Sequence, residues 1–185
     1  MDAAGHVREA LKLLGLTSEK LPTPELDLGN TPERIVRMWR ELTQSVGKEP
    51  PFVSVFETEH TSMLTLTGIS FVSLCSHHFA PFRGTVDIGY LPKSKLVGIS
   101  KPARIVNYFA ACPQTQELLT SQIADYLTEK LEPEGVMVVV RAEHTCVSCR
   151  GVCKPGAMFI TSEVRGVFLE DLRIKSEFLQ LIGAR

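Results

Sequence analysis

The amino-acid sequence predicts an α+β fold in which helices and an antiparallel sheet form separate segments of one domain. Runs of apolar residues at helical spacing occur at both ends and in the middle of the chain. Between them, short β-rich runs are bounded by turn residues. The 185 residues, 44% of them hydrophobic, are enough to bury one core.

The N-terminal part of the chain reads as two helices joined by a loop. Residues 3–14 place apolar side chains on one helical face, and the proline-containing segment 17–30 reads as the loop. Thr31 is a candidate N-cap, because Pro32 suits the first position of a helix. We expect this second helix to end near Gly47.

The first β-rich region predicts a hairpin. Val86, Ile88 and Tyr90 alternate with polar or small residues, which is typical of a half-buried strand. A polar turn at 92–95 and a second apolar run at 96–99 follow. We therefore expect these two runs to pair with each other.

The rest of the chain continues with two helices, two strands and a last helix. Ser100 can cap a helix over 101–109, and Pro113 is expected to open the next helix. The remaining predicted elements are strands at 136–142 and 158–161 and a helix at 172–182.

Charge and hydropathy argue against several classes of partner. Twenty Lys and Arg balance 21 Asp and Glu, so no global field would draw the chain to nucleic acid. The apolar runs are far shorter than the roughly 20 residues that cross a bilayer, and the polar start does not resemble a signal peptide. We expect a cytoplasmic protein that binds neither nucleic acid nor membrane.

Cysteine and histidine gather at two places about 70 residues apart. Cys75, His77 and His78 lie in the first β-rich region, and His144 and Cys146 follow the strong strand at 136–142. Thiolate and imidazole suit zinc, and two strand ends can bring such ligands together. An odd number of cysteines, five, also favours metal or thiol chemistry over disulfides.

Three interpretations of this cluster remain open. The residues could be buried core side chains, although two such groups in one chain argue against that. Cys75 and His78 with Cys146 and Cys149 could form a closed structural zinc site.

An open catalytic site is favoured by two further imidazoles. His77 and His144 should project beside Cys75 and Cys146, because strand residues two apart share a face. A zinc with three protein ligands keeps a water of lowered pKa, and the additional histidines can move protons.

Basic residues predict a site for a polyphosphate. Arg34 and Arg37 lie three residues apart on the second predicted helix. Gly98, Ser100 and Lys101 stand at a predicted helix N-terminus, where free N–H groups favour phosphate. Each cation alone also fits a solvated surface position. Arg104 and Arg150 complete the candidate cluster.

Gln116 and Glu117 are candidates for recognising a base. A carboxylate can accept hydrogen bonds from N1–H and the exocyclic amine of guanine, a pair of donors that adenine lacks. The helix dipole alone also favours Glu in a first turn, so composition leaves both readings of Glu117 open.

In their combination these motifs are highly specific, and the chain resembles the GTP cyclohydrolase I family over roughly its last 155 residues. The resemblance divides the chain into an N-terminal helix and loop, 1–30, and a catalytic domain, 31–185. The matching motifs are Thr31-Pro32-Glu33-Arg34, Cys75-Ser76-His77-His78-Phe79, Gly98-Ile99-Ser100-Lys101, Pro113-Gln114-Thr115-Gln116-Glu117, His144-Thr145-Cys146, Arg150-Gly151, Lys154-Pro155-Gly156, Thr161-Ser162 and Arg165-Gly166.

The resemblance implies a fold and a reaction. The family has a tunnelling fold (T-fold), an antiparallel sheet with helices on one side whose sheets form an intersubunit barrel in a homodecamer, with sites at subunit interfaces. The implied reaction is hydrolysis of GTP at C8, with ring opening, formate release and reclosure to 7,8-dihydroneopterin triphosphate.

The resemblance also assigns roles to single residues. Zinc would be bound by Cys75, His78 and Cys146, and protons would be transferred by His77 and His144. The guanine readers would be Gln116 and Glu117, and the triphosphate pocket would be Arg34, Arg37, Ser100, Lys101, Arg104 and Arg150.

The chain departs from the family pattern at three positions. Ser76 stands where the family has Glu, and Cys149 and Cys153 flank Arg150 where other residues are expected. Two alternative functions follow. One is a tunnelling-fold paralogue acting on a related purine or pterin, and the other is a noncatalytic zinc-stabilised assembly that binds GTP.

Overall fold

The computed structural model describes residues 2–17 and 29–183. They form two compact units, Met1–Gln44 and Ser45–Arg185. The first unit holds α1 (Ala3–Leu13) and α2 (Thr31–Leu42), so both N-terminal helices are confirmed. The predicted loop at 17–30 lies largely outside the described residues.

Local side-chain chemistry defines the two helices of the first unit. The Asp2 carboxylate caps α1 by accepting from the backbone N–H of Gly5, and the Arg8 guanidinium donates to Glu33 of α2 at 2.7 Å. The N-cap of α2 is Asn30 rather than Thr31. This helix also ends at Leu42, earlier than expected.

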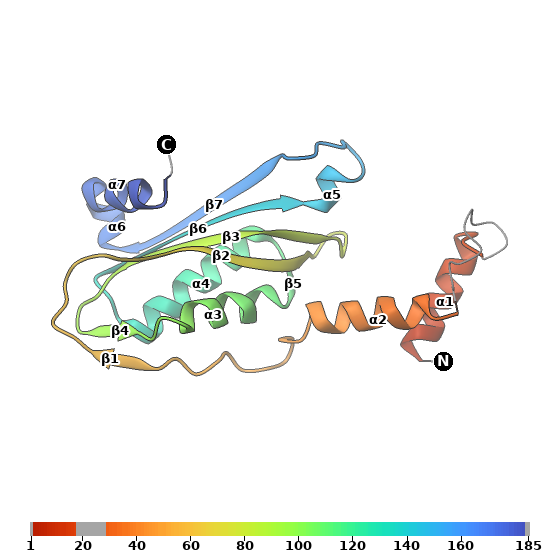
Figure 1. Cartoon of the computed structure of the whole chain (residues 1–185), viewed down its shortest axis with the longest axis horizontal. Helices are drawn as coiled ribbons and strands as arrows, with labels where there is room; N and C mark the ends of the chain where they lie inside the picture. The colour runs from red at the N-terminus through yellow and green to blue at the C-terminus, as the bar shows by residue number, and fades with distance from the viewer. Residues whose placement is uncertain (1, 18–28, 184–185) are drawn as a thin grey trace. The chain divides into compact units, whose positions relative to one another are not determined.

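The second unit is built on a five-stranded sheet (Figure 1). Its four long strands are antiparallel to their neighbours among these four. The fifth strand is short, lies at one edge and runs parallel to its neighbour. In spatial order the strands are β5 (Pro113–Gln114), β2 (Leu64–Cys75), β3 (Pro81–Leu91), β6 (Gly135–His144) and β7 (Met158–Gly166).

The predicted hairpin around the 92–95 turn is wrong. β4 (Lys95–Val97) pairs with β1 (Val55–Glu57) in a separate two-stranded sheet, while β3 pairs with β2 and β6. β3 pairs instead along both of its edges, with β2 across the short turn at 76–80 and with β6, and these two ladders leave no free edge for β4. The only bond across the turn that the described residues show is from the Val97 N–H to the Tyr90 hydroxyl.

One face of the sheet packs against α3 (Lys101–Ala110) and α4 (Gln116–Leu131), as Figure 1 shows. Even-numbered residues of β3 and β6, such as Val86 and Val138, are fully buried in this core. Ile123 of α4 is among the apolar side chains that meet them.

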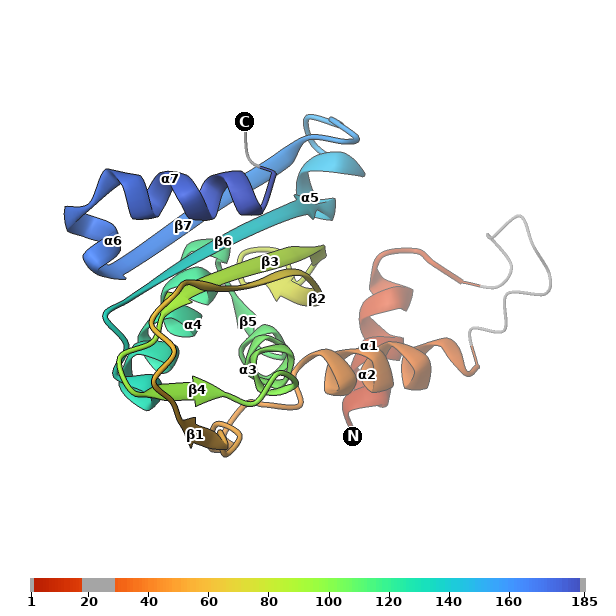
Figure 2. The ribbon, with the colours of Figure 1, turned by 60° about the vertical axis from the view of Figure 1, so that its left-hand side comes forward.

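Helices also cover part of the opposite face, which corrects the expectation of helices on one side only. Met137 and Val139 point away from α4, and they pack with Phe168 and Phe178. These aromatic residues lie on the two C-terminal helices, which Figure 2 places along the other side of the sheet. The two helices are α6 (Val167–Glu170) and α7 (Leu172–Leu181).

The start of α4 differs from its predicted position. Pro113 lies in β5 instead of opening the helix, and Thr115 is the N-cap, its hydroxyl accepting from the N–H of Leu118. Ser100 is the N-cap residue of α3 as expected, but its side chain makes no capping bond. Among the described residues, no helix is long and apolar enough to cross a membrane.

Candidate metal centre and adjacent cavity

The first half of the metal centre is a tight turn at the end of β2. Cys75 is the last residue of this strand, and its N–H donates to the carbonyl of Ala80 at 2.9 Å. The bond closes a turn that carries His77 and His78, and Phe79 adopts a positive φ of 51° within it. The chain therefore presents both imidazoles directly beside the buried Cys75 thiol.

The second half follows β6. His144 ends this strand opposite Phe82 of β3, and a short helix, α5 (Thr145–Ser148), begins at once. The Thr145 hydroxyl donates to the carbonyl of Pro81 at 2.6 Å, which ties α5 to the start of β3. Cys146 thus lies on α5, and not on a strand beside His144 as the spacing argument assumed.

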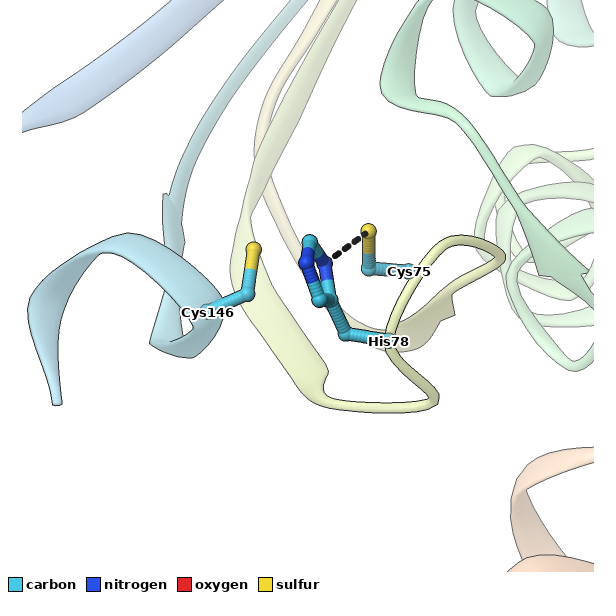
Figure 3. A group of neighbouring side chains, drawn as sticks. All are labelled: Cys75, His78 and Cys146. Atoms are coloured by element: carbon cyan, nitrogen blue, oxygen red, sulfur yellow. Dashed lines mark hydrogen bonds between the residues drawn. The ribbon is translucent and has the colours of Figure 1, made fainter. Parts of the chain in front are cut away.

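Cys75, His78 and Cys146 together form a group that could hold a metal ion (Figure 3). Their ligand atoms all lie within 4.8 Å of one another, and the Cys75 Sγ is 3.9 Å from the His78 Nδ1. Burial raises the pKa of the Cys146 thiol, and the nearby Cys75 raises it further. A bound cation would offset both effects, because metal ligation deprotonates a thiol. The residues therefore fit a metal.

Cys149 and Cys153 lie outside this group. Both thiols are exposed, and that of Cys149 donates to the carbonyl of Thr145. Among the described residues the metal group has three members, so the four-ligand set with Cys149 is not formed. Three protein ligands leave a tetrahedral ion one open position, as in catalytic sites.

A cavity of about 350 Å³ adjoins the metal group. Its size lies within the usual range of small-molecule sites, roughly 300–1,000 Å³. The wall combines apolar side chains with the polar groups expected from the sequence. It brings together Cys75, His77, His78, Thr115, Gln116, Glu117, His144, Cys146, Val147, Ala157, Met158 and Phe159.

His144 is held by three neighbours. Its ring stacks on Phe82 with centroids 4.5 Å apart and meets Phe159 edge-on at 5.9 Å. The third contact is from Nε2 to the Gln116 side-chain oxygen, at 2.9 Å. Burial lowers the pKa of His144, while the nearby Glu117 carboxylate opposes the shift.

The side chain of Gln116 contacts protein groups instead of facing a ligand. It is 1% exposed, and its amide nitrogen donates to the carbonyls of Val140 and Phe159 and to the Thr161 hydroxyl. Its oxygen contacts His144. The guanine-reading role expected of this side chain does not fit, whereas Glu117 is exposed at the cavity wall.

The candidate phosphate residues do not line this cavity. Ser100, Lys101 and Arg104 stand at the start of α3, whereas β5, which pairs with Cys75, follows the end of that helix. Within one chain these three residues lie outside the cavity that adjoins the metal group.

The remaining candidate arginines have different positions. Arg150 follows α5, and its charge acts on Cys146 by lowering the pKa of that thiol. Arg34 and Arg37 lie together on α2 in the first unit, where they line a hollow of about 470 Å³ with Asn30 and Glu33.

Sequence reasoning missed the residues that orient His144. Phe82 carried no signal of its own, because only the β3–β6 register places it against His144. Phe159 was expected only as a strand residue, and Thr161 only as a strand residue within the matching Thr161-Ser162 motif, yet they contact His144 and Gln116 respectively. An aromatic residue that pairs across two strands with a candidate catalytic residue would be such a signal. It can be recognised only when the strand pairing is already known.

The α+β fold, the Cys–His–Cys group and the adjoining cavity are together those of an enzyme with a single metal site. A family model described as GTP cyclohydrolase I matches residues 3–183. The chain belongs to the GTP cyclohydrolase I family.

Individual relatives agree with this assignment. The GTP cyclohydrolase 1 of Streptomyces coelicolor is 46% identical over 187 residues, covering 99% of this chain and 90% of that protein. That of Aquifex aeolicus is 46% identical over 155 residues, 84% of each chain.

A solved structure shares the fold at low identity. The crystal structure of the archaeosine synthase QueF-Like in the apo form has a TM-score of 0.50 and 16% identity, and it covers 58% of this chain and 97% of that one. This likeness concerns the fold alone.

Proposed function

We propose that this chain is a zinc-dependent GTP cyclohydrolase, with residues 31–185 as its catalytic domain. It hydrolyses GTP at C8, opens the imidazole ring, releases formate and recloses the product to 7,8-dihydroneopterin triphosphate. The observation that carries the proposal is the three-ligand group of Cys75, His78 and Cys146 on the wall of a cavity with two further histidines. When bound there, zinc supplies an activated water for attack on C8.

Glu117 recognises the guanine base. Its carboxylate lies at the cavity wall, where it can accept from N1–H and the exocyclic amine. Gln116 contributes to this recognition through its backbone N–H. Because Gln116 is the first residue of α4, this N–H has no acceptor within the helix and can donate to the guanine oxygen.

His77 and His144 move the protons. Both line the cavity without being members of the metal group. An imidazole beside the base can protonate the ring nitrogen as water adds to C8, and a second one can serve the later ring opening. The low polarity around His144, with Phe82 stacked on it, keeps bulk water away from one side of this residue.

A second copy of the chain would supply part of the triphosphate pocket. Lys101 and Arg104 do not line the cavity beside the metal group of their own chain. A site completed by a neighbouring copy resolves this, and Arg150 near Cys146 supplies a cation from the same chain. We propose a homodecamer with sheets joined in an intersubunit barrel and with sites at its interfaces.

The decisive test combines metal analysis with product identification. Purified protein incubated with GTP should release formate and yield a product that becomes a fluorescent pterin on oxidation, with about one zinc per chain. Unchanged GTP bound to zinc-loaded protein would contradict the proposal, and would support the noncatalytic assembly instead.

A further inference from the structure

Gln116 is the residue that controls the orientation of His144, and this inference rests on the proposed function. The glutamine is the first residue of α4 and is almost fully buried. Its side-chain amide links α4 to β6 and β7 at the cavity wall. The two hydrogens of the amide nitrogen are shared among three acceptors, so the side-chain oxygen of Gln116 is the amide atom that meets His144.

The assignment starts from two backbone carbonyls. The oxygens of Val140 and Phe159 can only accept hydrogen bonds, and they lie 3.1 and 3.0 Å from one atom of the Gln116 amide. That atom must be the nitrogen, because an amide oxygen cannot donate. The side-chain oxygen of Gln116 therefore faces His144.

The threonine hydroxyls agree with this orientation. Thr120 donates to the backbone carbonyl of Gln116 at 2.7 Å, so the 2.6 Å bond between Thr120 and Thr161 must use the hydrogen of Thr161. The Thr161 oxygen is then free to accept from the Gln116 amide nitrogen at 3.1 Å. Each hydroxyl in the network has one consistent role.

We propose that Gln116 is a positioning residue that fixes the neutral imidazole of His144 as the Nε2–H tautomer. The side-chain oxygen of Gln116 can only accept, so the Nε2 atom 2.9 Å away must donate. Nδ1 then holds the lone pair, and it is the nitrogen through which His144 takes and returns a proton. Stacking on Phe82 and the edge contact with Phe159 keep the ring from turning.

The tautomer can be observed without any turnover. Zinc-loaded protein with ¹⁵N-labelled histidine is measured by solid-state ¹⁵N NMR at about pH 8.5, above the ordinary histidine pKa of roughly 6.5. The signals of His144 are identified by their loss in His144→Ala. We expect a protonated Nε2 and an unprotonated Nδ1, and a proton on Nδ1 in the wild type would overturn the proposal.

A substitution tests whether Gln116 is the cause. Gln116→Met keeps the volume but removes the acceptor, so His144 should show a mixture of tautomers. The kcat for GTP should fall about 10- to 100-fold, the usual effect of losing a partner that orients a functional histidine. The KM should change little, because the side chain does not face the ligand. An unchanged tautomer in this variant would also overturn the proposal.

The matched control is Gln114→Met. Gln114 is another buried glutamine, 3% exposed, whose amide nitrogen donates to the carbonyls of Phe109 and Cys112 and not to a histidine. Its substitution should leave the ¹⁵N signals of His144 unchanged. If Gln116→Met does not fold, the wild-type spectrum still decides the tautomer. A chain that forms no pterin would contradict the proposed function alone, because the spectrum needs no reaction.

Discussion

In the proposed function, single residues divide the site into a metal group, a base reader and proton carriers, and each part can be removed separately. The metal group consists of Cys75, His78 and Cys146. Glu117 and His144 line the same cavity from different elements, the start of α4 and the end of β6. Substitutions at these positions should therefore have distinct effects on zinc content, GTP binding and turnover.

Two cysteine substitutions test the ligand set. Cys146→Ser should abolish zinc binding, because it removes one of three ligands, whereas Cys149→Ser should leave about one zinc per chain. Elemental analysis of the purified variants measures this directly. Loss of zinc from both variants would instead indicate the four-ligand structural site.

The carboxylate of Glu117 should determine nucleotide choice. Glu117→Ala should raise the KM for GTP by at least about 100-fold, since it removes two hydrogen bonds to a charged acceptor, each contributing roughly 1.5–3 kcal/mol. Zinc content should stay as in the wild type. Kinetics with GTP and ATP measure the effect, and equal use of both nucleotides by the wild-type protein would refute the assignment.

The two histidines outside the metal group should affect turnover. His77→Ala and His144→Ala should retain zinc and GTP binding while slowing pterin formation by about 10²- to 10⁴-fold, the usual contribution of one acid or base. At least one variant should accumulate a ring-opened formamido intermediate, detectable by mass spectrometry. Full activity in both would make these residues structural.

Among the elements, the β6–β7 ladder carries the site residues His144 and Met158 at one end and leads into α6 at the other. Gly135 pairs with Gly166 at the end of this ladder, and Gly166 has a φ of 61°. A Cβ placed there would lie 2.1 Å from the carbonyl oxygen of Glu134. The backbones are so close that only glycine fits, and this contact fixes where α6 begins.

Gly166→Ala should therefore destabilise the protein strongly. The change adds a backbone clash to a conformation that side chains rarely adopt, so we expect a loss of at least about 3 kcal/mol in the free energy of unfolding. Gly151→Ala is the matched control, because Gly151 has nearly the same φ, 60°, but open space around its Cβ position. It should cost only about 1–2 kcal/mol. Denaturant unfolding of both variants compares them, and equal losses would contradict the clash.

The element pattern also shows what the sequence could and could not reveal. Helices with regular apolar spacing, such as α1 and α7, were predicted within one or two residues. Strand pairing was not, because the alternation of Val86 and Ile88 does not identify β2 and β6 as the partners of β3. Residue types identified the metal group, but the roles of Gln116 and Phe82 depend on that pairing.

At the scale of the whole molecule, the proposed binding site is divided between copies of the chain. The metal group and Glu117 share a cavity, while Lys101 and Arg104, near the start of α3, do not line it. The sequence motifs assign all these residues to one site, but they do not indicate which copy of the chain supplies each residue. Chain-to-chain sharing is a property of the assembly.

Mixing two inactive variants should reveal this sharing. Cys146→Ser and Lys101→Ala should each be nearly inactive alone, but co-expressed chains should regain activity at about a quarter of the sites, since an intact site needs Cys146 from a Lys101→Ala chain beside Lys101 from a Cys146→Ser chain. Assay of the purified mixed assembly measures the recovery. If each site lay within one chain, mixed assemblies would show no gain over the separate variants.

The position of the metal ligands on the sheet has a consequence for how the protein matures. Cys75 and Cys146 are 71 residues apart and lie at the ends of β2 and just beyond β6, with β3 between these two strands. The ligands meet only after β3 has paired with both neighbours, so tight metal capture has to follow assembly of the sheet. The buried core includes Cys75 and has Cys146 packed against it, but it is formed mainly by apolar side chains of β3, β6 and α4 that can pack before a metal binds. In a zinc-poor cell, this chain should therefore accumulate as a folded apoprotein that is ready for loading, in contrast to small zinc domains, which stay unfolded until the ion arrives.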